Sequence, residues 1–280
     1  MTDTDSFTRH VAGSTPSKDS PFYNPSLQNV SAEVLDLLEQ YCGLTHERLV
    51  PHVKEIYPYP CIGMFRFLDI SLRFDPHYPA IVSRLKDRNH SFLDLGCGLS
   101  TEIRLLASDG VPGENLFGAD IRPEFLELGY DLFLDRDRLQ ATFLTADVFD
   151  PTSDLEELDE LVDIVHAGSF FQLFNYEKQV EIGKRVVKLL KPVKGSFLIG
   201  QQVGCEDAGV LESPNHEEIL YRHNEESWVD LWDDVSEQTG VVLDVFAHLE
   251  DSPRIFVKEG QPGEMWLADP KRLRFTVMRL

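Results

Sequence analysis

Gly96 and Gly98 follow a short apolar run in the sequence Ser-Phe-Leu-Asp-Leu-Gly-Cys-Gly (residues 91–98). Glycine after a strand lets the backbone pass close to a bound ligand, where a side chain would obstruct it. Ser100 and Thr101 come next and can cap a helix, whose first N–H groups would face a carboxylate or phosphate. A lone Gly-x-Gly pattern is weak evidence for a ligand site, because glycine at a strand end more often only forms a turn. The interpretation therefore depends on residues further along the chain.

Acidic residues end the next two strand-like runs. Asp120 closes residues 115–120 and lies about 20 residues beyond Gly98, the spacing of a carboxylate that binds a ribose diol. Asp147 closes residues 141–147, where it can accept a hydrogen bond from an adenine amino group. The loop lacks the third glycine of the dinucleotide motif and the Gly-Lys-Ser/Thr of a P-loop. The pattern therefore indicates a nucleoside ligand without a strong phosphate site.

Asp-Leu-Gly-Cys-Gly at residues 94–98, with acidic residues ending the next two strands, closely resembles the class I S-adenosylmethionine-dependent methyltransferases. The resemblance implies S-adenosyl-L-methionine as cofactor, with its methionine part near Asp94 and the glycines, its ribose at Asp120 and its adenine at Asp147. The cofactor-binding residues that we expect are Asp94, Gly96, Gly98, Asp120, Ile121, Asp147, Val148 and His166.

Four further segments are similar to the fungal O-methyltransferases of meroterpenoid biosynthesis: residues 57–68, 120–124, 166–171 and 221–228. This resemblance spans most of the chain beyond its first residues. It implies a cytoplasmic enzyme of secondary metabolism that forms a methyl ester on a terpenoid or polyketide-derived acid. The acceptor would be a small molecule, a prenylated aromatic or polyketide acid.

Methyl transfer to a carboxylate needs alignment and exclusion of water more than acid–base chemistry. A phenol acceptor, with a pKa near 10, would instead profit from a general base. A histidine at a strand end is more often structural, and an arginine among surplus carboxylates more often forms a surface ion pair. With these alternatives open, the candidate catalytic residues are His166, His223 and Gln202, and the candidate substrate-binding residues are Tyr59, Arg66, Phe170, Gln201 and Arg222.

From residue 91 onward, strand and helix signals alternate in the pattern of a parallel sheet covered on both faces. The spacing predicts helices at 100–108, 123–133, 176–190 and from 224 to 240, and strands at 92–95, 115–120, 141–147, 161–167 and 195–200. Residues 241–248 and 273–280 read as two strands with no helix between them. We therefore expect an α/β, Rossmann-like sheet, mostly parallel, with the C-terminal antiparallel pair of the class I methyltransferase fold.

We expect the chain before this region to comprise a polar, disordered tail (residues 1–20) and an N-terminal helical cap (residues 21–90), with residues 91–280 as the cofactor-binding domain. Helices are expected at 34–41, from Pro51 to before Pro58, and through 81–85. A cap beside the carboxyl ends of the strands would shape the acceptor pocket. A homodimer through the cap is an open alternative.

The chain of 280 residues carries 26 basic and 48 acidic side chains, a formal net charge of −22. That charge argues against nucleic acid or an anionic membrane as partner. No run approaches the roughly 18 apolar residues of a membrane helix, and the start lacks a signal-peptide pattern, so cytoplasm is the default. The 4 cysteines are scattered without Cys-x-x-Cys, so no metal site is expected.

Three other functions remain open at this point. A phenol O-methyltransferase would use one of the histidines as base. A protein methyltransferase-like regulator would share the cofactor fold but need an open acidic groove for a basic peptide. A non-catalytic scaffold that binds S-adenosylmethionine is opposed by the intact set of glycines and carboxylates.

Overall fold

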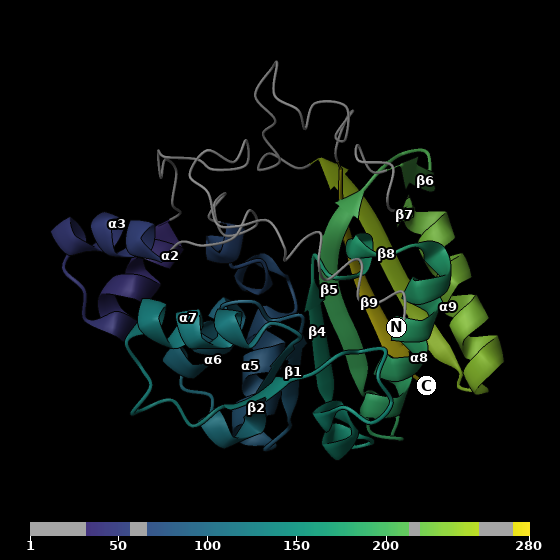
Figure 1. Ribbon diagram of the computed structural model, residues 1–280. Coiled ribbons are helices and arrows are strands. Elements are labelled where there is room, and N and C mark those ends of the chain that lie inside the picture. The colour runs from purple at the N-terminus through teal and green to yellow at the C-terminus, as the bar shows by residue number, and fades with distance from the viewer. Residues whose placement is uncertain (1–31, 57–65, 213–218, 252–270) are drawn as a thin grey trace.

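The centre of the protein is a seven-stranded sheet in the order β3-β2-β1-β4-β5-β9-β8 (Figure 1). The computed structural model describes residues 32–56, 66–212, 219–251 and 271–280. The first five strands are mutually parallel, and the last two form an antiparallel pair joined to β5. They are β1 (Phe92–Leu95), β2 (Leu116–Asp120), β3 (Thr142–Thr145), β4 (Ile164–Gly168), β5 (Phe197–Gly204), β8 (Leu243–Asp251) and β9 (Lys271–Arg279). The predicted fold class is confirmed.

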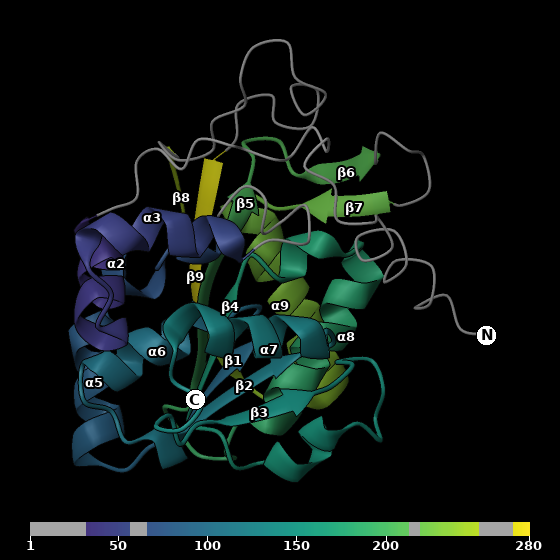
Figure 2. The same ribbon diagram turned by 60° about the vertical axis from the view of Figure 1, so that its left-hand side comes forward.

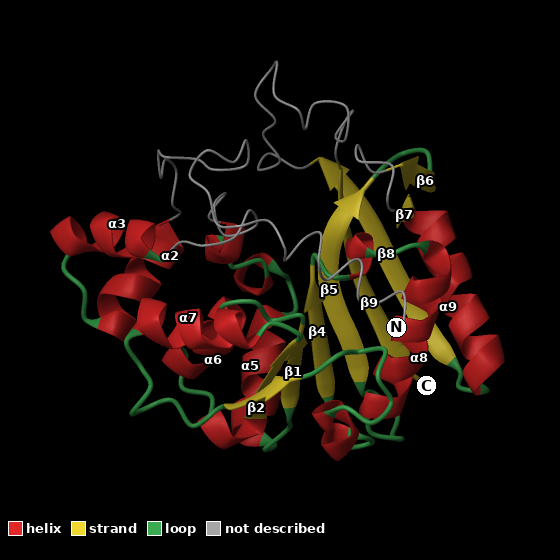
Figure 3. Cartoon of the chain, in the orientation of Figure 1, coloured by secondary structure: helices red, strands yellow, loops and turns green. Residues whose placement is uncertain are grey.

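Helices cover both faces of the sheet (Figure 3). One face carries α5 (Tyr78–Asp87), α6 (Thr101–Ser108) and α7 (Pro123–Phe133), and the other carries α8 (Tyr176–Leu189) and α9 (Glu225–Thr239). α9 begins as predicted at Asn224, which forms a reciprocal capping box with Ser227. Its two tryptophans, Trp228 and Trp232, are fully buried against the sheet, because their spacing places them on one helix face.

The N-terminal helices pack beyond α6 and α7, on the same side of the sheet (Figure 2). They are α2 (Ala32–Asp36), which continues as a π-helical turn over Leu37–Tyr41, and α3 (His46–Glu55). The prediction that the second helix starts at Pro51 is wrong, because it starts five residues earlier at His46 and holds Pro51 inside. The division of the chain into tail, cap and cofactor domain stays a prediction.

Two features near the carboxyl edge of the sheet differ from expectation. β5 continues four residues past Gly200, because β9 pairs with it along its whole length, from Phe197↔Met278 to Gly204↔Lys271. A short hairpin of β6 (Gly209–Glu212) and β7 (Ile219–Arg222) follows, and the sequence pattern did not indicate it. Short 3₁₀ turns complete the described elements, at Arg66–Leu68, Leu72–Phe74, Gly113–Asn115, Asp154–Leu158 and Phe171–Leu173.

Candidate functional site

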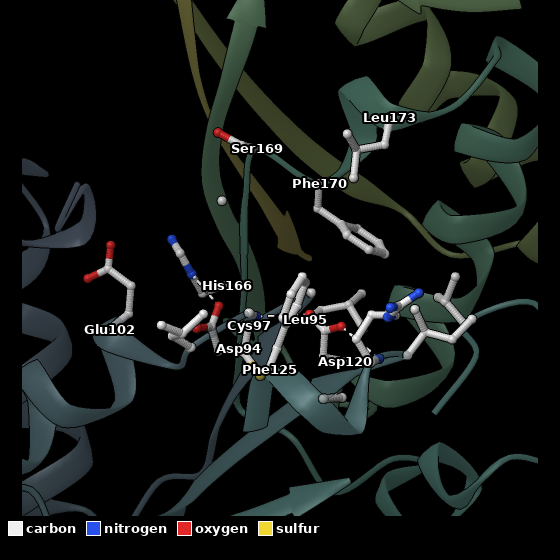
Figure 4. A pocket seen from close by; sticks show the side chains of 18 of the residues that line it. Asp94, Leu95, Cys97, Glu102, Asp120, Phe125, His166, Ser169, Phe170 and Leu173 are labelled. Atoms are coloured by element: carbon white, nitrogen blue, oxygen red, sulfur yellow. Dashed lines mark hydrogen bonds and ion pairs between the residues drawn. The ribbon is translucent and has the colours of Figure 1, made fainter. Parts of the chain in front are cut away.

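A cavity of about 430 Å³ opens at the carboxyl ends of the parallel strands. Its walls come from the segments that follow β1, β2, β3 and β4, from the first turn of α6, and from residues 67–71 of the N-terminal region. Figure 4 shows side chains from these segments converging on one space. In an open α/β sheet this edge is where ligands bind.

The loop after β1 bends through two glycines in the left-handed region, Gly96 at φ +73° and Gly98 at φ +54°. The amides of Gly96 and Cys97 donate to the Ala119 carbonyl (2.8 and 3.0 Å), which ties the loop to β2. A Cβ on Gly96 would lie 2.3 Å from the ring of Phe170, so only glycine fits there. The loop is therefore shaped for a close approach between backbone and ligand.

Ser100 does not cap α6, contrary to the prediction. Its backbone is left-handed (φ 58°), and its hydroxyl donates to the Cys97 sulfur at 3.2 Å instead of to a helix amide. The buried Arg104 fixes this turn, because its Nη1 donates to the carbonyls of Leu99 (3.0 Å) and Ser100 (3.4 Å). Its other donors bind Asp135 at 2.9 and 3.1 Å.

Asp120 closes the glycine loop from the end of β2. Its Oδ2 accepts the Gly98 amide and its Oδ1 accepts the Arg122 amide, both at 2.9 Å. Burial raises the pKa of Asp120, while these two hydrogen bonds oppose the shift. Asp147 likewise accepts the Phe149 amide at 2.9 Å. Each carboxylate oxygen can accept a further hydrogen bond, so both residues can bind hydroxyl or amino groups in the cavity.

Asp94 and His166 form a buried pair on adjacent strands. His166 Nδ1 lies 2.7 Å from Asp94 Oδ1, and the two residues are 2% and 4% exposed. Burial alone would lower the pKa of His166, but the carboxylates of Asp94 and Glu102 outweigh it and raise that pKa. The pair therefore favours a positive imidazolium in the wall of the cavity.

The cavity brings together most of the residues that the sequence singled out. The residues in question are Asp94, Gly96, Gly98, Asp120, Ile121, Asp147, Val148, His166, Phe170 and Gln201. Gln201 contributes a buried Oε1 that has no hydrogen-bond partner within the described part of the chain. Their shared position agrees with the expected site, and the role of each stays a prediction.

Three expected site residues, His223, Gln202 and Arg222, are not among the residues that line this cavity, and their expected roles stay predictions. His223 is fully buried, and its two ring nitrogens lie 3.0 Å from Ser227 Oγ and 3.1 Å from Gln179 Oε1. Burial lowers the pKa of His223 to about 4, so its imidazole is neutral near pH 7. Gln202 alternates with Gln201 along β5 and points into the interior, and Arg222 ends the hairpin strand β7.

Two expected substrate contacts, Tyr59 and the side chain of Arg66, lie outside the described residues. The cavity also has walls that sequence reasoning missed, among them Ser71, Glu102, Phe149 and Lys178. Sequence reasoning missed these residues because none of them lies at a predicted strand end or within one of the motifs described above. In α6 every residue from Thr101 to Leu106 is buried, so no polar face distinguished the glutamate.

Neither a metal cluster nor a membrane-spanning helix is present among the described residues. No group of three or more His, Cys, Asp or Glu side chains there is placed to hold a metal ion. Among the described helices, none combines the length and apolar character needed to cross a membrane.

Comparison with known proteins places this geometry in a family. A model described as a meroterpenoid methyltransferase N-terminal domain matches residues 22–68, and one described as a methyltransferase domain matches residues 93–197. O-methyltransferase phiE of Fungal sp. (strain ATCC 74256) is 43% identical over 84% of this chain and 81% of its own. The asnovolin E/chermesin D methyltransferase nvfJ of Aspergillus novofumigatus is 33% identical over 85% and 88%.

A solved structure has the same fold. Phosphoethanolamine N-methyltransferase 2 of Haemonchus contortus, in complex with phosphomonomethylethanolamine and S-adenosylhomocysteine, superposes with a TM-score of 0.51 at 17% identity. The match covers 91% of this chain and 61% of that one. At this identity the likeness concerns the fold alone.

Proposed function

Because the chain belongs to the class I S-adenosylmethionine-dependent methyltransferases, in a group of fungal enzymes of secondary metabolism, we propose that it methylates a carboxyl oxygen of a small hydrophobic acid. The product would be the methyl ester of a terpenoid or polyketide-derived intermediate. The cofactor is S-adenosyl-L-methionine, as the methyltransferase domain and its fold require. The nature of the acceptor is the proposal, and it rests on the walls of the cavity.

The residues around the cavity fit this cofactor. The glycine loop leaves room for backbone contact, since a Cβ on Gly98 would meet no protein atom within 4 Å. Asp120 and Asp147 present acceptors, which match the hydroxyls of a ribose and the amino group of an adenine. When bound, the cofactor supplies an electrophilic methyl group on a sulfonium. These side chains would hold its nucleoside and leave the space beside Phe170 and Gln201 for an acceptor.

The observation that carries the proposal is the buried His166 ring in the cavity wall, where the carboxylates of Asp94 and Glu102 raise its pKa. Its Nδ1 is committed to Asp94, so Nε2 is the ring atom left to meet a ligand. Gly168 lies against this edge of the ring, where a Cβ would sit 3.0 Å from Cε1 and 3.5 Å from Nε2. A donor at Nε2 favours an acceptor that carries negative charge, and a carboxylate is ionised at neutral pH.

Gln201 supports the same acceptor from the neighbouring strand. Its side-chain amide lines the cavity, and the NH₂ group of an amide can donate to the second carboxylate oxygen. Two donors would fix the plane of the carboxylate and align one oxygen with the methyl group. Such alignment and the exclusion of water account for catalysis without removal of a proton.

The test is incubation of the full chain with S-adenosylmethionine and a panel of prenylated aromatic acids, followed by mass spectrometry and alkaline hydrolysis of the product. A methyl ester reverts to the acid in alkali, whereas a methyl ether of a phenol does not. Matched acceptors in which either the carboxyl or the phenol is already methylated serve as controls. Methylation of the blocked acid would overturn the carboxyl assignment and favour a phenol acceptor.

A further inference from the structure

Glu102 is a buried carboxyl group with one oxygen left over. It lies in the first turn of α6, is 7% exposed and lines the cavity. Its Oε1 accepts two hydrogen bonds, from Ser71 Oγ at 3.0 Å and from the Leu72 amide at 3.1 Å. Its Oε2 is buried and has no hydrogen-bond partner among the described residues. A buried polar atom without a partner is costly, so a ligand group is expected there.

The position of Glu102 along the cavity indicates which group that is. Figure 4 shows Glu102 and Asp120 at opposite ends of a row, with Asp94 and His166 between them. If the nucleoside lies at Asp120, the amino-acid end of the same molecule extends toward Glu102. That end carries an α-ammonium group with three N–H donors, which require acceptors.

We propose that Glu102 Oε2 accepts a hydrogen bond from the α-ammonium group of S-adenosylmethionine and of its product S-adenosylhomocysteine. Asp94 lies in the same part of the wall, but one of its oxygens already accepts His166 Nδ1. Glu102 adds an acceptor whose orientation is fixed by two donors. The proposal rests on the cofactor and is independent of the acceptor that the enzyme methylates.

The two donors that fix Glu102 come from outside the α6 region. Ser71 and Leu72 belong to the N-terminal part of the chain, at the 3₁₀ turn Leu72–Phe74. Thr101 Oγ1 also donates to the Phe67 carbonyl at 2.7 Å. The N-terminal region therefore orients Glu102, the proposed acceptor for the ammonium group. Cofactor affinity should depend on how this region packs against α6.

The experiment compares two ligands by calorimetry. S-adenosylhomocysteine carries the amino-acid end, whereas 5′-methylthioadenosine has the same nucleoside and sulfur but lacks it. In Glu102→Gln we expect affinity for S-adenosylhomocysteine to fall roughly 10- to 100-fold, the range for a hydrogen bond to a charged group. Affinity for 5′-methylthioadenosine should stay within about twofold of the wild type.

Glu177→Gln is the matched control, because it removes an exposed carboxylate from the first turn of α8, outside the cavity. Equal losses for both ligands in Glu102→Gln would overturn the proposal in favour of a structural role. No loss for either would also overturn it. If Glu102→Gln does not fold, Ser71→Ala tests the same contact, with a smaller loss expected for S-adenosylhomocysteine alone.

The binding experiment on Glu102 and the test of ester formation can succeed or fail independently. Binding of S-adenosylhomocysteine needs no acceptor, so failure to find an acid substrate would leave the Glu102 proposal standing. Conversely, a normal ligand profile in Glu102→Gln would leave ester formation untouched.

Discussion

Asp94 and His166 are register partners on the parallel strands β1 and β4, and the Asp94 carboxylate lies 2.7 Å from His166 Nδ1. The pairing joins the first residue of the glycine-loop motif to the candidate catalytic histidine. Phe92 stacks on the imidazole with ring centroids 6.1 Å apart, so the ring is held from two sides. The orientation of Nε2 toward the cavity thus follows from strand register.

The charge of Asp94 sets the first prediction. Burial lowers the pKa of His166, whereas Asp94 raises it, and the net effect is a pKa above the ordinary value of histidine. The imidazolium therefore persists until the pH passes that raised pKa. With a carboxylate acceptor, kcat/KM should therefore fall as pH rises through it. Asp94→Asn removes the main cause that opposes burial, so the pKa of His166 falls, the fall in rate moves to lower pH, and we expect activity at neutral pH to drop roughly 10- to 100-fold,.

The measurement is kcat/KM against pH at saturating cofactor, with the S-adenosylhomocysteine affinity of Asp94→Asn measured alongside. That control separates lost cofactor binding from lost charge on His166. A rate that rises with pH in the wild type would contradict the prediction. Such a profile would favour the alternative in which neutral His166 acts as base toward a phenol.

Asp120 provides the second prediction. It is the proposed ribose contact, so Asp120→Ala should weaken S-adenosylhomocysteine and 5′-methylthioadenosine alike, by roughly 10- to 100-fold. This equal loss is the opposite of the selective loss expected in Glu102→Gln. Circular dichroism and thermal unfolding should show a folded protein, because Asp120 lies at a strand end beside the cavity. Normal affinity for both ligands would remove Asp120 from the cofactor site.

The contact between Gly96 and Phe170 gives a third prediction. Gly96→Ala places a Cβ 2.3 Å from the Phe170 ring at a backbone φ of +73°, so both steric overlap and backbone strain oppose it. Gly98→Ala, at φ +54°, meets only the strain. We expect a lower midpoint of thermal unfolding for Gly96→Ala than for Gly98→Ala.

A double-mutant cycle isolates the steric part. Phe170→Ala in the Gly96→Ala background should restore part of the lost thermal stability, because the ring that the new Cβ strikes is gone. The same change in the wild type should only remove packing. Absence of any recovery would mean that backbone strain alone accounts for the effect.

Local signals in the sequence predicted the elements that they control. The helix Pro123–Phe133 was predicted to the residue, because proline at its start and an apolar face define it,. Asn224 and Gly240 bounded α9 for similar reasons. The sequence predicts an end of β5 at Gly200, whereas the strand continues to Gly204, because its last three residues pair with β9, more than 60 residues away.

The site residues also fall into those that local spacing predicts and those that depend on tertiary structure. Gly96, Gly98, Asp120 and Asp147 were found because short spacing in the chain places them at strand ends. The Asp94–His166 pair depends on register between strands 72 residues apart, which spacing does not reveal. Glu102 lies on a helix that is buried all round, so its sequence context resembled neither a surface residue nor a motif.

The last prediction is that cofactor binding releases a proton from Glu102. Burial raises the pKa of Glu102 to about 7. Of the groups facing it, His166 and the donors Leu72 and Ser71 oppose that rise, whereas Asp94 adds to it. An α-ammonium group favours the ionised carboxylate, so at pH 7 binding should expel roughly half a proton, since about half of the Glu102 side chains are protonated there. Affinity for S-adenosylhomocysteine should then rise with pH from 6 and level off above 7.

Calorimetric titration in two buffers of different ionisation enthalpy measures that proton directly. Other ionisable groups, among them His166 and the amino group of the ligand, can also exchange protons on binding, so the quantity to compare is the difference between wild type and Glu102→Gln at each pH. We expect the variant to lose both the proton release and the rise in affinity between pH 6 and 7, while Glu177→Gln keeps both. If proton release in Glu102→Gln equals that of the wild type, the proton comes from another group, and Glu102 is already ionised before the cofactor binds.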